Sequence, residues 1–84
     1  MKLHAVAIRD IKANVFAQPY FVTSLGGAIR AFGDECQRAE KDNLMYKHPT
    51  DFELYKIGEY DDATGTLTPI EKEQLASGSA YQAN

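Results

Sequence analysis

The sequence has no tryptophan, one cysteine and two histidines, and these scarcities exclude several kinds of chemistry. A single cysteine, Cys36, excludes an intrachain disulfide and fits a reducing compartment. Neither His4 nor His48 has a partner at metal-ligand spacing, so we predict no zinc site. Gly26 and Gly27 lack the remainder of a phosphate-binding loop, and no Gly-x-Ser-x-Gly motif occurs. We therefore expect neither an enzyme nor a bound cofactor or metal.

Long apolar runs are also absent, so the sequence predicts no transmembrane helix and no signal peptide. With 84 residues, 44% of them hydrophobic and 25% charged, the chain has the composition of one small globular domain. A core of this size is marginally stable alone, so we expect the protein to form a homodimer.

The net charge of −3 is unevenly distributed along the chain. Residues 1–48 carry seven Lys and Arg against five Asp and Glu, a sum of +2. Residues 49–84 carry two Lys against seven Asp and Glu, a sum of −5. An acidic chain is a poor candidate for coating nucleic acid through charge alone, and any contact with phosphates is expected in the basic N-terminal half.

Residues 18–32 predict the end of a strand followed by the only convincing helix, which extends from about Ser24 to about Arg38. The hydroxyl of Thr23 or Ser24 can cap the first turn. Apolar residues recur at the spacing of one helical face and are expected to pack in the core: Leu25, Ala28, Ile29, Phe32 and Cys36.

Segments rich in β-formers predict strands before and after this helix, at residues 2–9, 15–22 and 52–60, with a short return strand at 66–70. Pro19 interrupts the second strand, which makes it an edge strand or gives it a bulge. Gly58 predicts a bulge in the third strand. Residues 40–50 are expected to form a loop in which Leu44, Met45 and Tyr46 bury as a small plug.

These elements predict an α+β fold, a small antiparallel sheet of three to four strands with one helix packed on one face. Residues 1–70 are expected to form a single domain. Residues 71–84 lack periodicity and are expected to form a flexible polar C-terminal tail.

One helix covers only one face of such a sheet, so the other face must meet a second protomer, the C-terminal segment or a ligand. Aromatic side chains on an open sheet face beside basic residues can stack unpaired bases. The predicted elements therefore suggest a candidate nucleic-acid site in which cations contact phosphates and aromatic rings stack on bases. Its residues are Arg9, Lys12, Arg30, Tyr20 and Phe21. Arg30 also has a purely structural interpretation, in an exposed ladder of ion pairs with Asp34 and Arg38.

Several segments together carry a family resemblance over residues 1–70. They are the turn with Asp10, Lys12 and Ala13, the segments 19–21 and 28–32, the block 48–61, and Thr64-Gly65. The most specific part is a His-Pro-x-Asp block followed by Ile-Gly-x-Tyr-Asp. With these residues the chain resembles the small nonstructural protein of gokushoviruses, which are single-stranded DNA bacteriophages of the Microviridae.

The resemblance implies a non-virion protein of the host bacterial cytoplasm that acts in viral single-stranded DNA synthesis or in the hand-over of that DNA to packaging. The leading hypothesis is an accessory protein that binds single-stranded DNA. The alternative is a protein–protein adaptor that docks to the viral replication complex or procapsid with little direct DNA contact. The aromatic and basic strands favour DNA binding, whereas the charge split favours the adaptor; a host-directed regulator is a third option.

Overall fold

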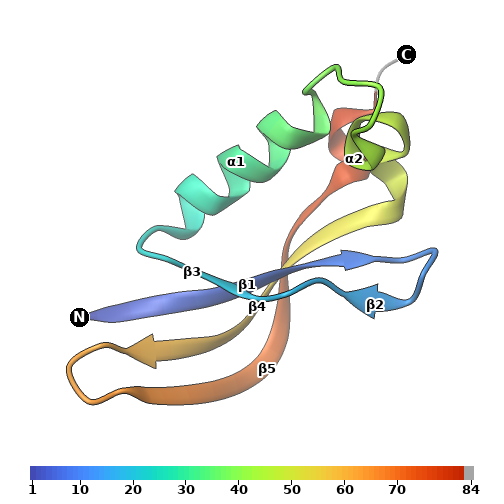
Figure 1. Ribbon diagram of the computed structural model, residues 1–84. Coiled ribbons are helices and arrows are strands. Elements are labelled where there is room, and N and C mark those ends of the chain that lie inside the picture. Colours follow the sequence, from blue (N-terminus) through green and yellow to red (C-terminus); the bar gives the residue numbers. More distant parts are fainter. Residues whose placement is uncertain (83–84) are drawn as a thin grey trace.

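The computed structural model describes residues 1–82 and has an α+β fold, in which one main helix lies over a curled antiparallel sheet (Figure 1). Within these residues the strands are β1 (Lys2–Asp10), β2 (Val15–Phe16), β3 (Tyr20–Val22), β4 (Phe52–Asp61) and β5 (Thr66–Ser77). The helices are α1 (Leu25–Cys36) and α2 (Leu44–Lys47), with single 3-10 turns at η1 (Pro49–Asp51) and η2 (Gly78–Tyr81). The order across the sheet is β2-β1-β4-β5, and β3 also pairs with β1. The predicted fold class is confirmed.

Strand β1 lies in the middle of the sheet and is paired on both sides. Along one side it pairs with β4 over its whole length, from Lys2 opposite Asp61 to Asp10 opposite Phe52. The other side is shared by β2 and β3. Pro19 lies between these two short strands, where no ladder hydrogen bond from its nitrogen is needed. The predicted interruption of the second strand by proline is therefore confirmed.

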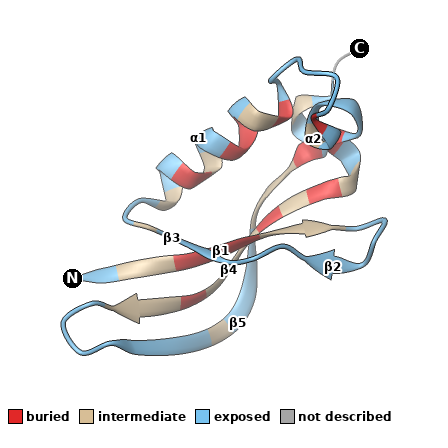
Figure 2. Ribbon diagram, in the orientation of Figure 1, coloured by how far each residue is buried: buried red, intermediate tan, exposed pale blue. Residues whose placement is uncertain are grey.

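Helix α1 packs its apolar stripe against β1 and β4. The Ser24 hydroxyl caps the helix by accepting a hydrogen bond from the Gly27 amide at 3.0 Å. Phe32 is the largest fully buried side chain. The predicted stripe is confirmed, because its residues pack with those of the sheet in one core, whose buried members are Val6, Ala28, Phe32, Cys36, Phe52 and Leu54 (Figure 2).

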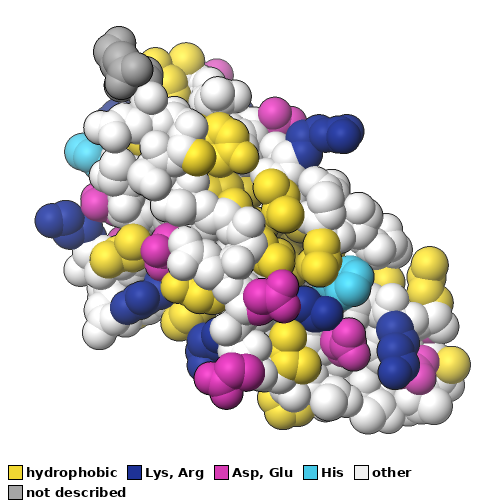
Figure 3. Space-filling model, turned by 180° about the vertical axis from the view of Figure 1, so that it is seen from behind, with side chains coloured by type: hydrophobic (Ala, Val, Ile, Leu, Met, Phe, Trp, Pro, Cys, Tyr) yellow, Lys and Arg dark blue, Asp and Glu magenta, His cyan; other side chains and the backbone are white. Residues whose placement is uncertain are grey.

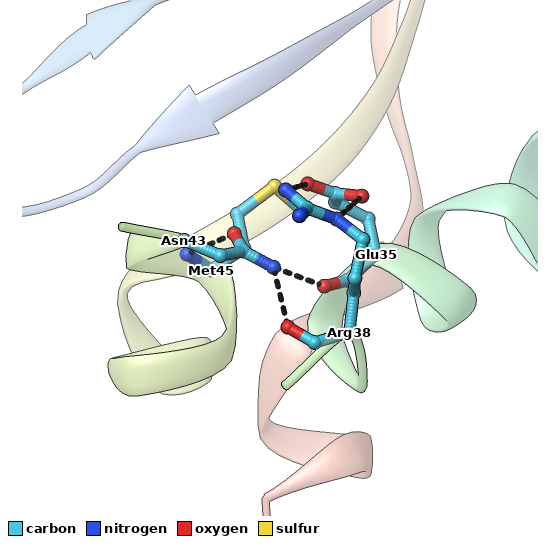
Figure 4. A network of polar contacts seen from close by, with 4 residues as sticks. All are labelled: Glu35, Arg38, Asn43 and Met45. Atoms are coloured by element: carbon cyan, nitrogen blue, oxygen red, sulfur yellow. Dashed lines mark hydrogen bonds and ion pairs between the residues drawn. The ribbon is translucent and has the colours of Figure 1, made fainter. Parts of the chain in front are cut away.

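The connection after α1 contains a helical turn where a loop was expected. Asn43 is buried, and its side-chain amide donates to the carbonyls of Glu35 at 2.8 Å and Arg38 at 3.0 Å (Figure 4). Its Oδ1 accepts from the Met45 amide at 3.1 Å and so caps α2. These bonds fix α2 to the end of α1. Of the three residues expected to form a plug, only Met45 packs against the core; Leu44 and Tyr46 are exposed.

The segment after Ile70 differs from the expected tail, because β5 continues to Ser77 and η2 follows it. Leu75, Ala76 and Tyr81 pack against the core, and the Tyr81 ring lies 6.3 Å from the Phe32 ring in an edge-to-face arrangement. The periodicity is lost because the pairing of β5 with β4 shifts register twice, and each bulge breaks the alternation of apolar and polar residues. Residues 83–84 of the expected tail lie outside the described residues.

Truncation of Phe32 tests the assignment of the helical faces. We predict that Phe32→Ala lowers the free energy of unfolding by about 3–5 kcal/mol, because it removes a large buried side chain from a packed core. Arg38→Ala, at an exposed position, should cost under about 0.5 kcal/mol. Urea unfolding followed by circular dichroism measures both, and equal midpoints would contradict the assignment.

A matched pair of leucines tests whether the C-terminal strand belongs to the core. Leu75→Ala should cost about 2 kcal/mol, the low end for a Leu→Ala change in a core, because Leu75 is only partly buried. Leu67, in the same strand, is 60% exposed, and Leu67→Ala should cost under about 1 kcal/mol. If the segment after Ile70 were detached from the core, neither substitution would change the unfolding midpoint.

Candidate nucleic-acid interface

The face of the sheet that α1 does not cover is formed by alternate residues of β1 and by their cross-strand neighbours. Val6 packs with the helix, so Ala5 and Ala7 point to the opposite face. The register places Phe21 opposite Ala5, Tyr55 opposite Ala7 and Tyr60 opposite Leu3, which brings these rings to the same face. This surface is called the open face below, and its residues are Leu3, Ala5, Ala7, Arg9, Phe16, Phe21, Tyr55 and Tyr60.

Two pairs of aromatic rings lie on the open face. The rings of Phe16 and Tyr55 are 5.5 Å apart in an edge-to-face arrangement, and those of Phe21 and Tyr60 are 5.2 Å apart and tilted. Phe16 and Phe21 are 40% and 46% exposed, so neither pair is enclosed by the protein. Small side chains on β1 leave room for these larger rings to meet across the strands.

Charged groups surround the first aromatic pair. The Arg9 guanidinium lies 5.9 Å from the centre of the Phe16 ring, and the Lys72 ammonium lies 6.0 Å from it. Arg9 also donates to the Asn14 side-chain oxygen at 3.0 Å and lies 4.0 Å from a Glu53 carboxylate oxygen. Glu53 is itself held by the Tyr55 hydroxyl at 3.0 Å. The face therefore carries cations, but Glu53 partly offsets their charge.

A groove of about 320 Å³ lies beside the second aromatic pair. Its lining is largely apolar and comprises Ala5, Pro19, Phe21, Ile57, Gly58, Leu67, Thr68 and Pro69. The predicted bulge in β4 is confirmed, since the register shifts between Lys56 and Gly58 and leaves Ile57 as the extra residue. Gly58 is required here, because a Cβ at this position would lie 2.7 Å from the backbone oxygen of Thr68.

The five residues singled out from the sequence do not form one site. Arg9 and Phe21 are both on the open face, but Phe21 lies opposite Ala5, four residues before Arg9 in β1. At the rise of a β-strand, four residues separate them by about 13 Å along the sheet. Tyr20 points to the helix side, where partial burial raises the pKa of its phenol. Arg30 is exposed on α1, and Lys12 is exposed in the turn between β1 and β2.

The open face also contains three residues that the sequence reasoning did not assign to a site, Phe16, Tyr55 and Tyr60, and Lys72 of β5, equally unassigned, reaches the Phe16 ring. Their placement depends on the register between strands that are distant in sequence, and on the bulges that turn Lys72 toward Phe16. The ladder proposed for Arg30 is also corrected, because Arg38 pairs with Glu35 instead, at 2.7 Å. This hydrogen bond lowers the pKa of the Glu35 carboxyl.

The surface seen from behind has no continuous basic region: Lys and Arg side chains are interspersed with Asp and Glu, and hydrophobic side chains gather in a band across the middle (Figure 3). Among residues 1–82, no group of three or more His, Cys, Asp and Glu side chains is placed to hold a metal ion. In the same part of the chain, neither helix is long and apolar enough to cross a membrane.

The chain matches the family model described as "Phage ORF5 protein" over residues 3–81. No curated protein and no solved structure matches the chain. The matched range extends from β1 through η2, so it includes the C-terminal strand that the sequence reasoning left outside the domain.

Proposed function

Because the chain belongs to the phage ORF5 protein family, we propose that it is a phage accessory protein that binds single-stranded DNA through the open face. The observation that carries this proposal is the presence, on the sheet face opposite α1, of two aromatic pairs in which Phe16 and Phe21 are exposed and their Tyr partners are half-buried. Every base has a π-face that can stack on such rings, and each stacked base contributes about 1–3 kcal/mol.

The electrostatics of the open face favour single strands over duplex DNA. A duplex hides its base faces and offers chiefly phosphates, which a protein of net charge −3 is poorly suited to coat. A single strand exposes its bases to Phe16, Phe21, Tyr55 and Tyr60. Few cations are then needed. Arg9 and Lys72 lie beside the Phe16 ring, where they can meet phosphates next to a stacked base. Lys12 is exposed in the turn that leads into β2, the strand of Phe16.

The biological setting of the proposal rests on the resemblance to gokushovirus nonstructural proteins. In that setting the protein acts in the host bacterial cytoplasm, outside the virion, during viral single-stranded DNA synthesis and the hand-over of the DNA to packaging. The role requires no catalytic residue and no cofactor, because stacking and phosphate contacts suffice.

The groove beside Phe21 favours a second candidate function, that of an adaptor. Its apolar lining, with Leu67 and Pro69 at one wall, is suited to an apolar side chain of a replication or procapsid protein. In this case the acidic C-terminal half would repel DNA, and the aromatic pairs would serve a protein contact.

The two candidates are separated by fluorescence anisotropy of a labelled oligonucleotide with the full chain at several salt concentrations. We predict binding of single-stranded DNA that weakens when Lys12 and Lys72 are both changed to Gln. The slope of log affinity against log salt should fall by about 1.4, the value for two lost phosphate contacts on a single strand. Phe16→Leu, which keeps an apolar side chain but removes a ring, should weaken binding at every salt concentration.

The matched control is the double variant Lys41→Gln, Lys47→Gln, which removes the same charge from the region of α2. It should leave the salt slope unchanged. An equal loss in both double variants would indicate a general charge effect and contradict a site on the open face. No binding at low salt would reject the DNA proposal and support the adaptor.

A further inference from the structure

One border of the molecule lacks charge altogether. Residues 13–29 contain no Asp, Glu, Lys, Arg or His, and they form β2, β3 and the first turns of α1. These residues are called the uncharged edge below. Residues 13–21 are all exposed, and they include the large hydrophobic side chains of Val15, Phe16, Tyr20 and Phe21. Exposed apolar surface of this kind is typical of an interaction site.

The two borders of the sheet differ in how they are protected against pairing with another strand. At the β5 border, Pro69 and the charged run Glu71-Lys72-Glu73 accompany two register shifts, all of which discourage an added strand. At the opposite border, β3 pairs only with β1 within residues 1–82. Its outer side therefore offers unpaired backbone groups, and the residues that flank β3 in the sequence carry no charge.

The first turns of α1 continue the uncharged edge beside β3. A shallow groove of about 380 Å³ lies there, lined by β3 and by the small residues Gly27, Ala28 and Ala31. Gly26 and Gly27 weaken the helix relative to alanine, but they let another backbone approach closely. The nearest heavy atom to a Cβ built at Gly27 belongs to the helix cap, Ser24, at 3.5 Å, so close packing within residues 1–82 does not explain the pair of glycines.

We propose that the uncharged edge is the interface of a homodimer, in which the β3 strands of two copies pair antiparallel about a two-fold axis and the first turns of α1 pack beside them. A second copy fits this surface because two chains of net charge −3 repel least where neither carries charge. A two-fold contact also needs a patch that complements itself, which an uncharged apolar patch does.

The surface area that a stable dimer buries requires both β3 and the adjoining first turns of α1 to lie in the interface. A standard interface buries about 800 Å² on each partner, roughly one seventh of the 5509 Å² surface of this chain. A strand of three residues is too short to supply that area alone. The adjoining groove with Gly27 and Ala31 supplies the remainder. The dimer does not depend on DNA binding, and it is measured without DNA.

Sedimentation equilibrium of the full chain tests the dimer, from low micromolar to hundreds of micromolar protein. We expect a species of twice the 9.3 kDa chain mass. Thr23→Lys, at an exposed position of the edge, and Ala31→Glu, at an exposed position of the adjoining groove, should each raise the dissociation constant at least about tenfold. The reason is that the two-fold axis introduces two like charges into the interface.

Ala39→Glu is the matched control for Ala31→Glu, since it makes the same substitution at an exposed position outside the edge and its groove, and it should leave the dissociation constant unchanged. Circular dichroism and urea unfolding of each variant show that the fold is kept. A wild-type monomer at all concentrations would overturn the proposal. So would a dimer that tolerates both edge charges, or one that Ala39→Glu weakens equally.

Discussion

The packing of α1 across β1 and β4 is the contact on which the rest of the structure depends. Phe32 lies at its centre, and the helix supplies one apolar stripe, which is enough for one face of the sheet. β1 reflects this asymmetry, because Val6 and Ile8 meet the helix while Ala5 and Ala7 face away from it. The small side chains on the far side cannot fill a core. They leave space in which rings from the neighbouring strands meet, and this produces the aromatic pairs of the open face.

The end of the chain completes the core on the helix side of the sheet. Leu75 and Ala76 reach the core from β5, and Tyr81 packs edge-on against Phe32. Gly33 permits this approach, since a Cβ there would lie 2.7 Å from the Tyr81 ring. The sequence left three possible covers for the second sheet face: a second protomer, the C-terminal segment or a ligand. The C-terminal segment packs on the helix side through Leu75, Ala76 and Tyr81, and Lys72 reaches only the Phe16 ring of the open face. A protomer or a ligand therefore remains to cover that face.

The helix and most strands were predictable from local sequence signals. The pairing between strands that are distant in sequence was not predictable. The stripe from Leu25 to Cys36, the Ser24 cap, the break at Pro19 and the bulge near Gly58 each depend on a few adjacent residues. The full length of β5 was missed because two bulges hide its alternation. The separation of Tyr20 from Phe21 follows from strand alternation alone, but the meeting of Phe16 with Tyr55 depends on the register of β1 with β4, which no local pattern encodes.

The geometry of β3 links the dimer interface to the open face. Antiparallel pairing of two β3 strands about a two-fold axis perpendicular to the sheet would continue the sheet from one copy into the next. The two open faces would then lie on the same side, with a Phe21–Tyr60 pair near each side of the axis. A single strand of DNA crossing such a dimer would pass from ring to ring and meet few cations. Recognition of that kind depends on stacking more than on charge, which is consistent with an acidic chain whose basic residues are scattered.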